Sequence, residues 1–109
     1  MAESKLLFDE HPLVVQPALA TALGLNEAIV LQQVHYWLKM RLNIIEGEAW
    51  VYNTVEQWRE QFPFWSYDTV KRTLHRLEEA GLLITGNFNK LNLDRTKWYR
   101  IDYEALTPD

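Results

Sequence analysis

Two arginines at helical spacing are the residues of this sequence best suited to bind a charged ligand. Arg72 and Arg76 are four residues apart in the segment SYDTVKRTLHRLEEAG, residues 66–81, so a helix would place them on one face. A guanidinium group is a planar fork of N–H donors that can hold a guanine edge or a phosphate with two hydrogen bonds. This pattern indicates an anion or nucleic-acid site.

Further polar side chains accompany these arginines on the same helix and in a loop that follows it. The helix is predicted over 67–80, with Ser66 as its N-cap and with Val70, Leu74 and Leu77 as its buried stripe. The candidate DNA-binding residues are Ser66, Asp68, Thr69, Lys71, Arg72, His75 and Arg76 on this helix and Asn89, Lys90, Asn92 and Arg95 in the loop 86–95.

An ordinary solvent-exposed helix is the alternative interpretation of the same residues. Asp68 and Arg72, and likewise Arg76 and Glu79, have the spacing of surface ion pairs, each worth about 0.2–0.5 kcal/mol. The loop 86–95 would then be a solvated turn.

The distribution of charge along the chain favours a nucleic-acid site, whereas the net charge does not. The formal net charge is −4, which is unusual for a protein that binds a polyanion. Residues 66–100, however, hold seven Lys/Arg against four Asp/Glu, whereas residues 1–65 hold four against eight. The positive charge is therefore concentrated around the candidate helix.

Other kinds of site have little support. The three histidines, His11, His35 and His75, fall in different predicted elements, and there is no cysteine. Neither a phosphate-binding glycine loop nor a nucleophile motif is present. We therefore expect no metal, no cofactor and no enzymatic activity.

Aromatic residues offer a second way to bind nucleic acid, because unpaired bases stack on aromatic rings. The candidates are Trp50, Trp58, Phe62, Phe64, Trp65 and Trp98. We expect most of them to be core or turn residues, since Trp58 and Phe62 share the inner face of a helix. Packing accounts least for Trp65 and Trp98, and an exposed Trp98 beside the loop would reopen the question.

The elements that must position these residues form one domain, 1–109, with an extension over 1–25 and a core over 26–106. The predicted order is strand 13–16, helix 17–23, helix 26–42, loop 43–48, strand 50–52, a short helix capped by Asn53 or Thr54 and stopped by Pro63, helix 67–80, strand 82–85, loop 86–95 and strand 96–103. This order predicts an α+β fold, mainly α: a winged helix-turn-helix with an extra N-terminal strand and short helix.

Helix 26–42 is apolar on two sides. Val30, Leu31, Val34, Trp37, Leu38 and Leu42 form one broad face. Ile29, Tyr36 and Met40 form a second strip, which would contact either the segment 6–25 or a second copy of the chain. These three are therefore the candidate oligomerisation residues.

Membrane insertion and secretion are not expected. The longest apolar runs are far shorter than the roughly 20 residues of a membrane span. The N-terminal segment lacks the basic stretch of a secretory signal. The lack of cysteine fits a reducing compartment, so we expect a cytoplasmic protein.

Several blocks of the sequence resemble a known family. LNEAIVLQQVHYWL, FPFWS, GNFNK and DRTKWY lie within a similarity that extends from about Pro12 to Leu106. The chain resembles the N-terminal winged-helix domain of replication proteins from phages and mobile elements of Gram-positive bacteria, relatives of replisome organisers and DnaD-type primosome proteins. The resemblance implies a domain that binds double-stranded DNA in replication initiation or helicase loading, as a homodimer and in contact with other replication proteins.

The resemblance also implies a rival function. In DnaD-type proteins the N-terminal winged helix serves largely for oligomerisation, so the chain could be a protein-interaction module with weak or no DNA binding. A transcriptional regulator is the neighbouring alternative. Longer members of the group carry a further C-terminal region, so the chain is expected to be either an N-terminal domain or a short free-standing version.

Overall fold

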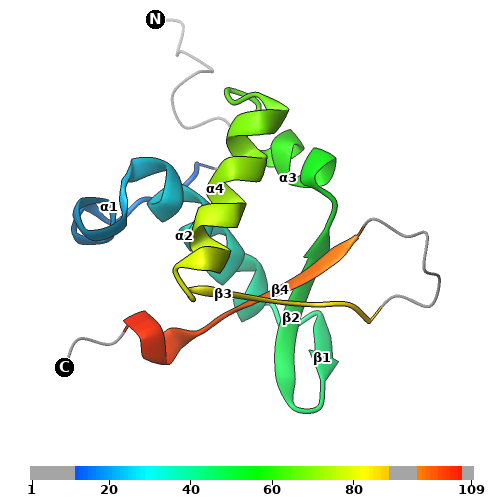
Figure 1. Cartoon of the computed structure of the whole chain (residues 1–109). Coiled ribbons are helices and arrows are strands. Elements are labelled where there is room, and N and C mark those ends of the chain that lie inside the picture. The colour runs from blue at the N-terminus through cyan, green and yellow to red at the C-terminus, as the bar shows by residue number, and fades with distance from the viewer. Residues whose placement is uncertain (1–11, 89–95, 107–109) are drawn as a thin grey trace, which may run out of the picture.

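The computed structural model describes residues 12–88 and 96–106, and Figure 1 shows how their helices and strands are arranged. Within these ranges the chain has an α+β fold with four α-helices, a 3-10 helix and a four-stranded antiparallel sheet. In chain order the elements are α1 (Pro17–Leu23), α2 (Leu25–Lys39), β1 (Asn43–Ile45), β2 (Glu48–Asn53), α3 (Val55–Gln61), α4 (Tyr67–Glu79), β3 (Leu83–Gly86), β4 (Lys97–Ile101) and the 3-10 helix η1 (Tyr103–Leu106).

Helix α2 lies at the centre of the core, because it packs against α4 and against strands β2 and β4. Its side chains Val30 and Val34 are completely buried. The rest of the core consists of Leu31, Leu38, Val51, Trp58, Phe62, Val70, Leu74, Leu77, Leu82, Leu83, Tyr99 and Ile101. Because each large apolar side chain contributes about 1.5–3 kcal/mol on burial, this core fixes α4 and the sheet relative to one another.

Side-chain caps determine where α3 and α4 begin. Thr54, rather than Asn53, caps α3: its hydroxyl accepts from the Gln57 N–H at 3.1 Å, and the Gln57 side chain accepts from the Thr54 N–H at 2.8 Å. Ser66 caps α4 as predicted, with its hydroxyl accepting from the Thr69 N–H at 3.2 Å. The five residues 62–66 between these helices form the turn that sets α4 against α3.

The sheet has the strand order β1-β2-β4-β3 and therefore two faces of different character. Tyr99 pairs with Val51 and Ile101 pairs with Leu83, and all four side chains are buried toward the helices. Trp98 and Arg100 alternate with them along β4 and so lie on the opposite face. The strand predicted over 96–103 is present, but β4 ends at Ile101 and Tyr103 begins η1 instead of continuing the strand.

The prediction of a loop over residues 43–48 is wrong. These residues form strand β1 and the turn of a β1–β2 hairpin, with Asn43 opposite Trp50 and Ile45 opposite Glu48. Glu46 and Gly47 have φ values of 51° and 83°, the two positive values that a tight hairpin turn of the right twist requires. The hairpin projects from the body of the molecule, away from α4 (Figure 1).

Two predictions for the N-terminal half also fail. Residues 13–16 are not a strand; they lie outside the sheet, and Val14 and Val15 are exposed. A β-prone run becomes a strand only where a neighbouring strand pairs with its backbone. Helix α2 spans 25–39 instead of 26–42, and Leu42, which was expected on the buried face, lies beyond its end and is 70% exposed.

Candidate nucleic-acid interface

The outward face of α4 carries the helical part of the predicted site. Val70, Leu74 and Leu77 are buried as predicted, and Thr73 is buried beside them. The opposite face therefore points to solvent. Its exposed residues are Ser66, Asp68, Lys71, Arg72, His75 and Arg76, and Thr69 is half-buried. The structure thus brings the predicted helical residues onto one surface, which we call the α4 face.

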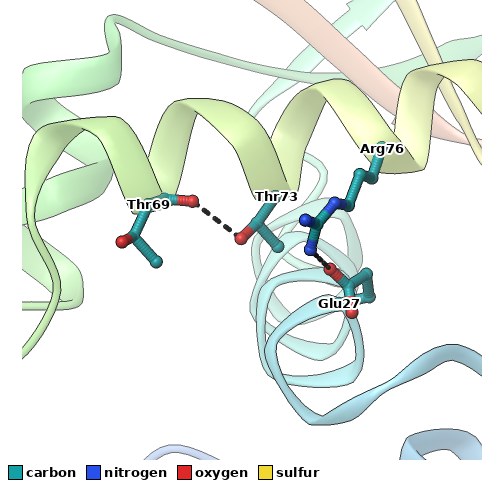
Figure 2. Close-up of polar contacts among 4 residues, drawn as sticks. All are labelled: Glu27, Thr69, Thr73 and Arg76. Atoms are coloured by element: carbon teal, nitrogen blue, oxygen red, sulfur yellow. Dashed lines mark hydrogen bonds and ion pairs between the residues drawn. The ribbon is translucent and has the colours of Figure 1, made fainter.

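The beginning of α4 is held by hydrogen bonds within the helix. The Ser66 and Thr69 hydroxyls lie 3.1 Å apart, and the Thr73 hydroxyl donates to the Thr69 carbonyl at 2.7 Å (Figure 2). Asp68 in the first turn suits the positive end of the helix dipole. Its negative charge would repel a phosphate, so Asp68 is better suited to stabilising the helix than to binding DNA.

Arg76 forms an ion pair with α2, and not with a residue of its own helix. Its Nη1 atom lies 3.4 Å from Glu27 Oε2 on α2, as Figure 2 shows. The Glu27 side chain is only 14% exposed, whereas that of Arg76 is 62% exposed. A side chain on Gly24 would collide with the Glu27 carboxylate, so this glycine leaves the space that Glu27 occupies. Glu27 therefore competes with any phosphate for Arg76.

The surface pair that the alternative interpretation offered between Arg76 and Glu79 is not formed. Glu79 instead contacts His75, with His75 Nε2 and Glu79 Oε1 at 3.0 Å and with both side chains about two-thirds exposed. Such exposed contacts contribute about 1 kcal/mol or less. His75 and Arg76 thus each face a carboxylate at the C-terminal half of α4.

Lys71 and Arg72 differ from these two residues. Both are exposed, and within residues 12–88 and 96–106 neither makes an ion pair. The pair between Asp68 and Arg72 that the alternative interpretation offered is therefore not formed there. The N-terminal half of α4 presents two cations that no described carboxylate neutralises.

A third cation next to the α4 face was missed by the sequence analysis. Lys97, at the start of β4, and Lys71 both line a groove of about 180 Å³ between α4 and the sheet. Its Nζ atom is 3.6 Å from Glu78 Oε1, and the lysine side chain is more than half exposed. Only the fold brings Lys97 to Lys71, because the two are far apart in the sequence.

The remaining predicted residues divide into two groups. The predicted loop residues Asn89, Lys90, Asn92 and Arg95 lie outside the described residues. Between β3 and β4 the structure describes the chain up to Phe88 and again from Thr96. Of the predicted oligomerisation residues, Ile29 is partly buried and packs against the core, Tyr36 is half-buried with its ring against Trp37, and Met40 is exposed. The strip is therefore partly internal and opens to solvent at Met40.

Away from the α4 face, a polar contact joins α2 to η1. His35 Nδ1 lies 2.8 Å from the Tyr103 hydroxyl, and the two rings meet edge to face. Burial, and then the charge of Lys39, lower the pKa of His35 below its usual 6.5. Burial raises the pKa of Tyr103 above its usual value.

Comparison with protein-family models, with curated proteins and with solved structures gave no match. In the part of the chain that the structure describes, no helix is both long enough and apolar enough to cross a membrane. Over the same residues, no three His, Asp or Glu side chains gather in a way that could hold a metal ion.

Proposed function

We propose that this chain is a winged helix-turn-helix domain that binds double-stranded DNA through the α4 face. Helices α3 and α4 would be the two helices of the motif, and the β3–β4 hairpin would be the wing. The observation that carries the proposal is the pair of exposed cations Lys71 and Arg72 in the N-terminal half of α4, the half that enters the major groove in such motifs.

Each residue of the α4 face has a distinct role in this proposal. Arg72 would bind a guanine edge or a phosphate with its two-pronged guanidinium. Lys71 and Lys97, which line one groove, would bind the phosphates next to it. Arg76 would join them when a phosphate displaces the Glu27 carboxylate, which is 3.4 Å away.

The replication setting rests on the family resemblance of the sequence. It supports a role in initiation or helicase loading for a phage or mobile element, a cytoplasmic location, and assembly as a homodimer with other replication proteins. The contrast between the basic segment 66–100 and the acidic segment 1–65 fits a domain with DNA on one side and protein on the other.

Fluorescence-anisotropy titration of labelled duplex DNA over a series of salt concentrations tests the proposal. We expect wild-type binding to weaken steeply with salt, and the variant Lys71→Ala/Arg72→Ala to lose at least about tenfold in affinity and about two units of the salt slope. Lys39→Ala, an exposed lysine at the end of α2, is the matched control and should bind like the wild type. Equal affinity and slope for the double variant and the wild type would refute the proposal.

Self-assembly is the second candidate function, and one observation favours it. Met40, Leu42 and Ile44 are exposed apolar side chains close together in the sequence, where α2 leads into β1. A dimer held there should become monomeric in Leu42→Glu, as measured by sedimentation equilibrium. A wild-type chain that is monomeric at every concentration would exclude this function.

A further inference from the structure

The outer face of the sheet carries aromatic rings where a solvated face usually carries polar side chains. Strand register places Tyr52 of β2 beside Trp98 of β4, and Gly86 of β3 on the other side of Trp98. Trp50 lies two residues before Tyr52 and hence on the same face. Together with Phe88, which follows β3, the residues Trp50, Tyr52 and Trp98 form what we call the aromatic face.

The rings of the aromatic face are packed against one another in a fixed arrangement. The Tyr52 and Trp98 rings are 4.6 Å apart and inclined by only 33°, while Phe88 meets Trp50 and Trp98 edge to face at 4.9 and 5.5 Å. Gly86 makes this possible, since a Cβ there would lie 2.9 Å from Phe88 and 3.2 Å from Trp50. Tyr52 and Phe88 nevertheless stay 47% and 42% exposed, so the aromatic face presents ring surface to solvent.

One positive charge lies against these rings. The Arg100 guanidinium lies 5.5 Å from the centre of the Trp50 ring, a cation–π contact that leaves the edge of its fork able to bind a phosphate. Lys97 alternates with Trp98 along β4 and lies on the other side of the sheet, in the groove beside α4. An anionic ligand could therefore bind here although the formal net charge of the chain is −4.

A groove of about 530 Å³ adjoins the aromatic face and is lined by amides as well as rings. Trp50 and Tyr52 form part of its wall, and Asn43, Asn53, Gln57 and Gln61 supply the amides. The Gln57 and Gln61 carbonyl oxygens already accept hydrogen bonds, from the Thr54 N–H and from the Trp37 indole respectively. These glutamines can therefore offer their side-chain N–H donors to a ligand, and such donors suit a base edge that carries carbonyl acceptors.

From these observations we propose that the aromatic face and its groove bind single-stranded DNA or RNA, with unpaired bases stacked on Tyr52, Phe88 and Trp98 and a phosphate on Arg100. Ring surface, amide donors and a cation together match the base faces, base edges and phosphates of an unpaired strand. A duplex hides its base faces in its own stack and cannot bind in this way. The site is separate from the α4 face and does not depend on DNA binding there.

Quenching of tryptophan fluorescence by oligo-dT of about 12 nucleotides tests this proposal, because thymine has two carbonyl acceptors and a base that can stack. We expect saturable quenching by the wild type. The variant Tyr52→Ala/Phe88→Ala should bind at least about tenfold more weakly, since each stacked base contributes about 5- to 150-fold. Phe64→Ala removes an aromatic ring that is 58% exposed outside the aromatic face, and it should bind like the wild type.

Further variants separate this site from the α4 face and from a loss of folding. Lys71→Ala/Arg72→Ala should keep its affinity for oligo-dT, whereas Tyr52→Ala/Phe88→Ala should keep its affinity for duplex DNA. Arg100→Gln leaves all four rings in place and should still weaken oligo-dT binding. It therefore tests the site even if Tyr52→Ala/Phe88→Ala melts at a lower temperature than the wild type. Unchanged oligo-dT affinity in both sheet variants would overturn the proposal. A wild-type chain that binds no oligo-dT would also overturn it.

Discussion

The α4 face and the aromatic face are built on the same core but differ in what they present to a ligand. The α4 face offers the charges of Lys71 and Arg72. The aromatic face offers the Tyr52 and Phe88 rings, which are nearly half exposed, with Arg100 against the ring of Trp50. A surface of charges binds the phosphate backbone and weakens steeply with salt, whereas a surface of rings binds bases and depends less on salt. Under the two proposals, one small domain would distinguish paired from unpaired strands by which face it uses.

The largest expected effect comes from the core that both faces share. Leu74 is 2% exposed on the buried side of α4, so Leu74→Ala should lower the free energy of unfolding by about 2–5 kcal/mol. Arg72→Ala, two residues away on the exposed side, should change it by less than about 0.5 kcal/mol. Urea unfolding followed by circular dichroism measures both. A similar loss in the two variants would mean that α4 does not have the buried and exposed sides described.

The ion pair between Glu27 and Arg76 gives a smaller effect, confined to the α4 face. Glu27→Gln should raise duplex affinity about two- to fivefold, because an ion pair with a mostly exposed arginine, worth at most about 1 kcal/mol, no longer competes with phosphate. Affinity for oligo-dT should stay the same.

Glu79→Gln is the control for this variant, since it makes the same change in net charge but removes a contact with His75. It should raise duplex affinity less than Glu27→Gln does. Equal gains in the two variants would show that overall charge, and not the competition at Arg76, limits binding.

The smallest effect is expected at His35, which belongs to neither face. Its pKa is lower in the folded chain than the usual 6.5, so the folded state binds fewer protons than the unfolded state. Its contribution to stability is therefore complete above pH 6.5 and decreases as the pH falls from 6.5 toward the lowered pKa. Unfolding measured from about pH 8 to about pH 5 should show a shallower loss of stability in His35→Gln than in the wild type. Parallel curves for the two proteins would contradict this assignment.

Features encoded by residues close in sequence were predictable, which is why the α4 face was found first. The caps Thr54 and Ser66, the buried stripe of α4 and the alternation in β4 each depend on residues within a few positions of one another. The residues of the α4 face followed from the same helical periodicity.

Features that depend on distant residues were not predictable. Glu27 meets Arg76 across 49 positions of sequence, and only the packing of α2 on α4 brings them together. The aromatic face needed the register of three strands to place Tyr52, Phe88 and Trp98 together, although the sequence had singled out Trp98. The β1–β2 hairpin was missed because Glu46-Gly47 is a weaker turn signal than Asn-Gly, even with β-forming neighbours on both sides.

The most direct test of the two-face account is an NMR titration of the ¹⁵N-labelled chain with a DNA duplex and, separately, with oligo-dT. The account predicts that the duplex shifts the backbone amides of residues 66–76, and that oligo-dT shifts the indole N–H signals of Trp50 and Trp98. Duplex-induced shifts that leave residues 66–76 unchanged, or the same set of shifts with both ligands, would contradict it.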